Sequence, residues 1–225
     1  MTNTFGAHVV ETMRVRAYTE ACLRMVGLSW GNTLTRERYA EVLAPFDRKD
    51  NALSMASEQS SCALVCCAAL LDAGIDGLVA RWRNRPQCDP LREPRVGHYD
   101  AIMFLETLAI QRSVRRKVGA ERPDILPGSW VLIGGGSGDG GGAHIVCVVD
   151  VEHDGTLVTV EGGKSDPGNP KPGAKNCTRV AADRRELYPW PGGGWGMRDA
   201  GTTRAGRRAV YWCWVGDLPA LPEGA

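Results

Sequence analysis

Residues 58–71, EQSSCALVCCAALL, pass from polar turn residues into an apolar run at Cys62. The Ala, Leu, Val and Cys run predicts a helix that is buried nearly all round. Ser60 or Ser61 is a suitable N-cap, which places Cys62 in the first helical turn. Unpaired backbone N–H groups and the positive end of the helix dipole favour the nucleophilic thiolate there. The alternative interpretation is that Cys62 is only a small buried hydrophobic residue.

Helical patterns flank this stretch on both sides. Apolar residues recur every three or four positions over 9–27, which predicts an amphipathic helix that ends at Gly27. A short second helix is predicted over 33–43, starting at one of its two threonines and ended by the following proline. Downstream, residues 78–82 predict about one further helical turn, and residues 101–117 predict a helix with a basic end. We therefore expect residues 1–50 to form an N-terminal helical extension packed on a main domain at 51–225.

After Pro123 the pattern is typical of strands. Apolar or alternating runs predict strands at 129–133, 143–151, 156–161 and 208–215. Asp154-Gly155 between two of these runs predicts a tight hairpin. The glycine run at 134–142 lacks the Lys-Ser/Thr of a Walker loop and precedes a strand, so a flexible hairpin tip is favoured over a nucleotide-binding loop. Residues 162–207, rich in Gly, Pro and charge, are interpreted as one long loop that has a function or is mobile.

A thiol nucleophile needs an imidazole within hydrogen-bond reach and a polar group that orients this imidazole. Among four histidines, only His144 opens an apolar strand and follows glycines that let a substrate approach. If Asp154-Gly155 forms the turn, position 144 falls roughly opposite Glu161 at the end of the next strand. Glu161 is therefore the predicted orienting group, with an ordinary surface glutamate as the alternative. Asp139 and Asp150 are weaker candidates.

Four short motifs follow one another downstream: PGSWV at 127–131, GAHIVCV at 142–148, DGT at 154–156 and VEGG at 160–163. Their order resembles the CHAP-like and related papain-fold amidases (CHAP/NlpC-type). The resemblance implies an α+β, papain-like fold, with N-terminal helices packed on an antiparallel β-sheet. It also implies a catalytic triad of Cys62, His144 and Glu161 that cleaves amide bonds, most often in peptidoglycan. Gln59 is the candidate side-chain oxyanion donor, and its alternative role is helix capping.

Composition narrows the classes of partner. Lys and Arg total 27 against 26 for Asp and Glu, so the charge balance gives no argument for nucleic acid or an anionic membrane. No secretory signal and no stretch of ~20 apolar residues is visible, which predicts a chain made in the cytoplasm, with signal-less export left open. The eight cysteines form neither a disulfide framework nor a zinc pattern, so most are expected to be reduced and buried.

These patterns together predict a cysteine hydrolase that needs no metal or organic cofactor. The expected partner is a peptide or peptidoglycan substrate, and a secretion-system or immunity partner is compatible with signal-less export. A protease or deamidase acting on a cytoplasmic protein is the second hypothesis, because the same constellation also supports those reactions. The third is a non-enzymatic module that binds a partner through the segment 162–207.

Overall fold

The computed structural model describes residues 4–29, 32–39, 62–75, 115–134, 144–165, 179–204 and 206–218. Its α-helices are α1 (Thr4–Arg24), α2 (Thr33–Arg38) and α5 (Cys62–Asp72). Its strands are β1 (Arg116–Lys117), β2 (Ser129–Ile133), β3 (His144–Val151), β4 (Leu157–Lys164), β5 (Arg179–Pro189), β6 (Trp195–Asp199) and β7 (Arg207–Trp214), and the 3-10 helix η4 (Val215–Asp217) follows β7. None of the helices in these segments is long and apolar enough to cross a membrane.

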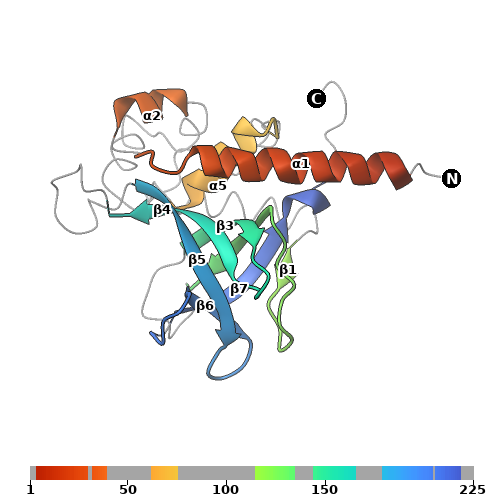
Figure 1. Ribbon diagram of the computed structural model, residues 1–225, viewed down its shortest axis with the longest axis vertical. Helices are drawn as coiled ribbons and strands as arrows, with labels where there is room; N and C mark the ends of the chain where they lie inside the picture. Colours follow the sequence, from red (N-terminus) through yellow and green to blue (C-terminus); the bar gives the residue numbers. More distant parts are fainter. Residues whose placement is uncertain are drawn as a thin grey trace, which may run out of the picture.

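The strands close into an antiparallel barrel (Figure 1). The sheet order is β1-β7-β2-β3-β4-β5-β6, and β6 also pairs with the start of β7 through Gly196↔Arg208 and Met197↔Arg207. Strands β2 to β7 therefore form a ring of six. The two-residue strand β1 pairs further along β7, at Tyr211 and Trp212.

The alternation of side chains along the strands builds two hydrophobic cores. The first lies between the barrel wall and the helices α1 and α5, which Figure 1 shows on the same side of the barrel. Trp130, Ile145 and Cys147 contribute to it from the strands. The second core takes the alternate residues, including Val131 and Val146, and fills the interior of the barrel. Strand β2 is buried at all five positions because it has a core on each face.

The predicted papain-like α+β fold, with N-terminal helices packed on an antiparallel sheet, is wrong, because the sheet closes into a barrel. The error arose at 162–207, which is not a long loop: β4 continues to Lys164, and β5 and β6 follow. These strands carry many charged residues, which form ion pairs with Glu152 in the β3–β4 connection, as Arg184 does, or across the strands, as in Arg198–Glu186. Their composition therefore resembled that of a loop, although they supply the strands that close the barrel.

The helix predictions have mixed outcomes. Helix α1 confirms the first one, and Gly27, with φ +88°, lies just beyond its end as expected. Helix α2 is shorter than predicted and is capped by Asn32, whose side chain accepts hydrogen bonds from two backbone N–H groups. Helix α5 begins at Cys62, while its predicted caps and residues 78–82 lie outside the described residues. The predicted helix at 101–117 is wrong at its end, because 116–117 form β1.

The strand predictions are confirmed within three residues at either end. β2, β3, β4 and β7 correspond to the four predicted runs. The hairpin between β3 and β4 is also present: Asp154 Oδ1 accepts a hydrogen bond of 2.9 Å from the Thr156 N–H, and Gly155 has φ +82°. This hairpin fixes the register of the two strands that carry His144 and Glu161.

Candidate functional site

Cys62 is the first residue of α5 and lies against the start of β3. The helix consists almost wholly of buried Ala, Leu, Val and Cys side chains, and it packs on β3 and β4. Cys62 itself is only 1 % exposed. Its sulfur accepts hydrogen bonds from the backbone N–H groups of Ala63 and Ile145 and is hydrogen-bonded to the side chain of His144. A buried sulfur with these donors is an environment that stabilises a thiolate.

His144, the first residue of β3, connects Cys62 to Glu161. Its Nε2 lies 3.0 Å from Glu161 Oε2, so Nδ1 is the ring nitrogen left for the sulfur of Cys62. The His144 side chain is 15 % exposed, whereas the Glu161 side chain is fully buried. The accessible edge of the site is therefore at the imidazole.

The Cys62 thiol and the His144 imidazole stabilise each other's charged form. Burial alone would raise the pKa of Cys62, but the charge and the hydrogen bond of His144, with the two backbone donors, lower it below its usual value. Burial likewise opposes charge on His144, and the interactions with Cys62 and Glu161 outweigh it and raise the pKa of His144 to about 9. These interactions therefore act in favour of a thiolate–imidazolium pair.

Glu161 lies in a buried set of donors that fix both carboxylate oxygens. Arg185 of β5 donates from Nε to Oε1 and from Nη2 to Oε2, each at 2.7 Å. Thr159 Oγ1 donates to Oε1 at 2.7 Å, and Lys164 Nζ lies 3.2 Å from Oε2. Burial raises the pKa of Glu161, but its hydrogen bonds and ion pairs with His144 and Arg185 hold it well below its usual range. Glu161 is therefore a carboxylate in a single orientation.

A second set of acids surrounds the cations that bind Glu161. Arg185 is also paired with Asp199 of β6 and, at 3.8 Å, with Asp183 of its own strand, and Lys164 is paired with Asp183. The sequence interpretation missed Arg185 and Lys164, because it placed them in or beside a loop. The signal that could have found Arg185 is the run Arg179–Pro189, which forms β5 despite its charges.

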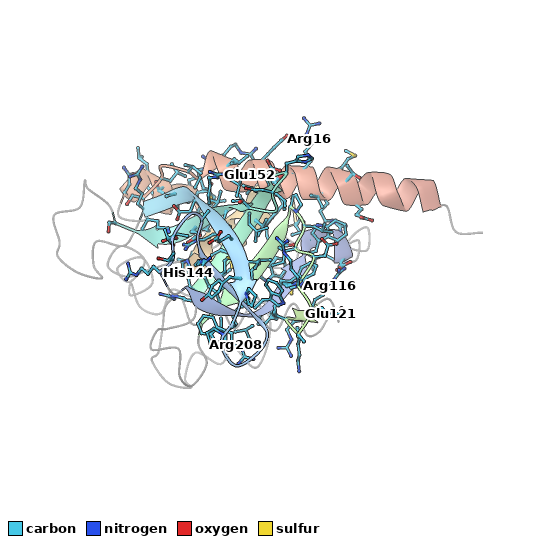
Figure 2. All side chains as sticks on the ribbon, turned by 60° about the horizontal axis from the view of Figure 1, so that its bottom comes forward. Arg16, Arg116, Glu121, His144, Glu152 and Arg208 are labelled. Atoms are coloured by element: carbon cyan, nitrogen blue, oxygen red, sulfur yellow. The ribbon has the colours of Figure 1, made fainter. Side chains whose placement is uncertain are left out.

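The structure brings Cys62, His144 and Glu161 together. Gln59 and Asp139 lie outside the described residues, so the predicted side-chain oxyanion donor has no described position. Asp150 is exposed near the far end of β3, where its Oδ1 accepts a hydrogen bond from the Val151 N–H. Figure 2 shows His144 well separated from Arg116 and Glu121. The contact of the Arg116 guanidinium with the Trp212 ring therefore belongs to another part of the barrel.

Comparison with protein-family models, curated proteins and solved structures found no match. The resemblance to CHAP-like amidases stays a prediction.

The described side chains support nucleophilic chemistry. No group of three or more His, Cys, Asp or Glu within the described segments could hold a metal ion. In contrast, Cys62, His144 and Glu161 occupy the positions of nucleophile, proton carrier and orienting carboxylate. The backbone N–H groups of Ala63 and Ile145 are hydrogen-bonded to the sulfur, which makes them candidate donors to the oxyanion of an attacked carbonyl.

Proposed function

We propose that this protein is a cysteine hydrolase that cleaves amide bonds through Cys62, His144 and Glu161. The Cys62 thiolate attacks the amide carbonyl and forms a carbon–sulfur bond. The His144 imidazolium then donates its proton to the leaving nitrogen as the carbon–nitrogen bond breaks. In the second half, neutral His144 takes a proton from water, the resulting hydroxide attacks the thioester, and Cys62 leaves as a thiolate.

The observation that carries this proposal is the chain of hydrogen bonds from Cys62 through His144 to Glu161. A cysteine kept only for packing has no need of a charged partner, and burial alone would make its thiol inert. Here the neighbouring imidazole reverses the effect of burial on the pKa of Cys62. The imidazole is in turn oriented at 3.0 Å by a carboxylate that Arg185 and Thr159 hold in place. A nucleophile, a base and an orienting group in series are the arrangement that acyl transfer requires.

Peptidoglycan is the substrate class we propose first, and the motif order around His144 and Glu161 supports it. The amide bonds of its stem and bridging peptides are cleaved by the same attack at a carbonyl carbon. Deamidation or cleavage of a cytoplasmic protein would use identical steps, since they differ only in the group attached to the carbonyl. A test with a defined substrate is therefore needed to distinguish peptidoglycan cleavage from deamidation or from cleavage of a cytoplasmic protein.

The experiment is digestion of purified muropeptides with product analysis by mass spectrometry. Wild-type protein should release fragments whose masses correspond to the addition of one water across an amide bond. Cys62→Ala should release none, and Cys67→Ala, which alters the same buried helix away from the imidazole, should retain the activity. Unchanged muropeptides with wild-type protein would rule out the wall substrate. If Cys62→Ala were fully active on any cleaved substrate, the cysteine mechanism would be wrong.

A further inference from the structure

Three other cysteines meet in the core between the helices and the barrel. Cys22 comes from α1, Cys66 from α5 and Cys147 from β3, and all three are fully buried. The Sγ atoms of Cys66 and Cys147 are 3.0 Å apart. Tyr18 donates its hydroxyl proton to Cys147 Sγ at 3.4 Å, and Cys22 is hydrogen-bonded to the same sulfur. Neither the proposed mechanism nor the sequence pattern uses this thiol cluster, so it requires its own explanation.

The separation of the two sulfurs is too short for ordinary packing. Non-bonded carbon atoms pack at roughly 3.5–4.0 Å, and sulfur is the larger atom. A disulfide bond is about 2.05 Å long, so about 1 Å of movement would bring Cys66 and Cys147 to bonding distance. The two residues also lie on different elements that already pack together, α5 and β3. Little backbone rearrangement is therefore needed to join them.

We propose that Cys66 and Cys147 are a redox-active pair that forms a disulfide with a small-molecule disulfide such as oxidised glutathione. The Cys147 thiolate attacks one sulfur of the oxidant and releases one reduced thiol. The Cys66 thiolate then attacks Cys147 in the mixed disulfide and releases the second. The two cysteines lose two electrons and two protons, and the oxidant takes up both as two thiols.

The environment of the cluster determines which sulfur reacts first and when. Burial raises the pKa of Cys66, and that of Cys22 as well. Burial also acts against a thiolate at Cys147, but the hydrogen bonds from Cys22, Cys66 and Tyr18 lower the pKa of Cys147. Cys147 is therefore the attacking thiol. Because the cluster is inaccessible in the fully folded chain, the oxidant reaches Cys147 late in folding or in a local opening of the core, in which these hydrogen bonds are still formed.

The disulfide would lie one helical turn behind the candidate site. Cys66 follows Cys62 by four residues on α5, and Cys147 follows His144 by three residues on β3. The bond would tie together the two elements that bring the nucleophile and the imidazole into contact. The inference does not depend on the proposed hydrolase activity, since it rests only on the positions of the core cysteines.

The test is refolding of the full-length chain in a glutathione redox buffer, followed by acid quenching, thiol alkylation and tryptic mapping. Cys147 is the sole cysteine of its expected peptide, 118–164, and Cys22 is the sole cysteine of 17–24, whereas Cys66 shares 50–81 with Cys62 and Cys67. The proposal expects 118–164 linked to 50–81, with the link lost in Cys66→Ala and kept in Cys67→Ala. A link from 118–164 to 17–24, a link that survives Cys66→Ala, or no link at all would overturn it.

Thermal unfolding of the same samples gives a second measurement. Oxidised wild-type protein should unfold about 5–10 °C above the reduced protein, because the bond closes a long loop in the unfolded chain. Cys67→Ala should show the same difference between oxidised and reduced forms, and Cys66→Ala should show none. If Cys66→Ala does not fold, the maps of Cys62→Ala and Cys67→Ala decide the outcome, because a link that persists in both variants is assigned to Cys66 and a link lost in either one is not. Equal midpoints for oxidised and reduced wild-type protein would contradict a disulfide that fits the native fold.

Discussion

Glu161 Oε2 lies 3.0 Å from His144 Nε2 although the two residues are not directly opposite each other in the β3–β4 ladder. The ladder pairs Cys147 with Val160 and Val148 with Thr159, and a bulge separates these pairs from those nearer the turn. Continuing this register places residue 163 opposite His144, so Glu161 is its diagonal neighbour on the same face of the sheet. The length of the glutamate side chain spans the diagonal. An aspartate at 161 would be too short to replace it.

Replacing Cys62 by Ala should abolish amide hydrolysis and leave the fold unchanged. The substitution removes the sulfur that is hydrogen-bonded to His144, and it removes few buried atoms. Hydrolysis rates and far-UV circular dichroism measure the two effects. Cys67→Ala is the matched control, since Cys67 is equally buried on the same helix. Equal loss of activity in both variants would show that the helix, and not the nucleophile, had been disturbed.

The rate at which iodoacetamide alkylates Cys62 should depend on His144. In the wild-type protein, His144 and the backbone donors lower the pKa of Cys62 and so increase the fraction of reactive thiolate. In His144→Ala only burial, which raises the pKa, and the backbone donors remain, so alkylation at pH 6–7 should slow. The cavity left by the missing imidazole would improve access and act in the opposite direction. The pH at which alkylation accelerates reports the thiol pKa independently of access, so a pH profile that does not move to higher pH in His144→Ala would argue against the ion pair.

The interaction of His144 with Cys62 also sets the highest pH at which the protein should be active. His144 has a pKa raised to about 9, so its imidazolium form is fully present below the ordinary value near 6.5 and is lost as the pH rises through about 9. Because the imidazolium donates the proton to the leaving nitrogen, kcat/KM should fall above pH 9. Glu161→Gln removes a negative charge and should move this limit to lower pH, with a loss of activity of at least about tenfold. A pH–rate profile of both proteins measures the shift, and an unmoved alkaline limb would exclude Glu161 as the orienting charge.

Arg185→Met should destabilise the protein by about 1–3 kcal/mol, since it removes two charge-assisted hydrogen bonds from a buried carboxylate that His144 and Lys164 then compensate only in part. The Arg185 side chain is 12 % exposed and binds both oxygens of Glu161. Its neighbour Arg184 is the matched control: that side chain is 60 % exposed and pairs with Glu152 at the surface, so Arg184→Met should cost less than about 1 kcal/mol. Urea unfolding of both variants gives the comparison.

The pH dependence of the stability lost in Arg185→Met distinguishes a charge effect from a packing effect. Glu161 has a depressed pKa, so its contribution to stability is present above the ordinary glutamate value and is lost as the pH falls through the folded-state value. The difference between wild-type protein and Arg185→Met should therefore be largest near neutral pH and shrink in acid. A difference that stayed constant with pH would assign the loss to packing of the arginine stem.

Local signals in the sequence were sufficient for α5, β2, β3, β4 and β7, because each is a run of apolar residues with a core on at least one side. The short turn at Asp154-Gly155 then related His144 to Glu161 through hairpin register alone. Closure of the barrel was not predictable in this way. It depends on β5 and β6, whose charged side chains find partners on other strands, such as Glu161 for Arg185 and Glu186 for Arg198. The meeting of Cys22, Cys66 and Cys147 is equally non-local, since they lie on three elements.

Closure of the barrel depends on a glycine between β6 and β7. A Cβ atom at Gly206 would lie 2.0 Å from the carbonyl oxygen of Met197 and 2.6 Å from the Cβ of Arg198. Met197 is one of the two β6 residues that pair with β7, so backbone would have to move at the closing contact. Gly206→Ala should therefore destabilise the protein by about 1–3 kcal/mol or more, as overpacking does.

Gly119→Ala is the control for this substitution, because a Cβ at Gly119 meets nothing within 4 Å. Hydrogen exchange adds a local measurement: Gly206→Ala should accelerate exchange of the β6 and β7 amides more than that of the β2–β3 ladder. The ladder between β2 and β3 has five consecutive paired positions, whereas β6 and β7 share only two, so the closing contact opens first. If the β2–β3 amides lost protection to the same extent, the substitution would be acting on the whole fold, and closure would not be the separable step that the two-residue β6–β7 pairing implies.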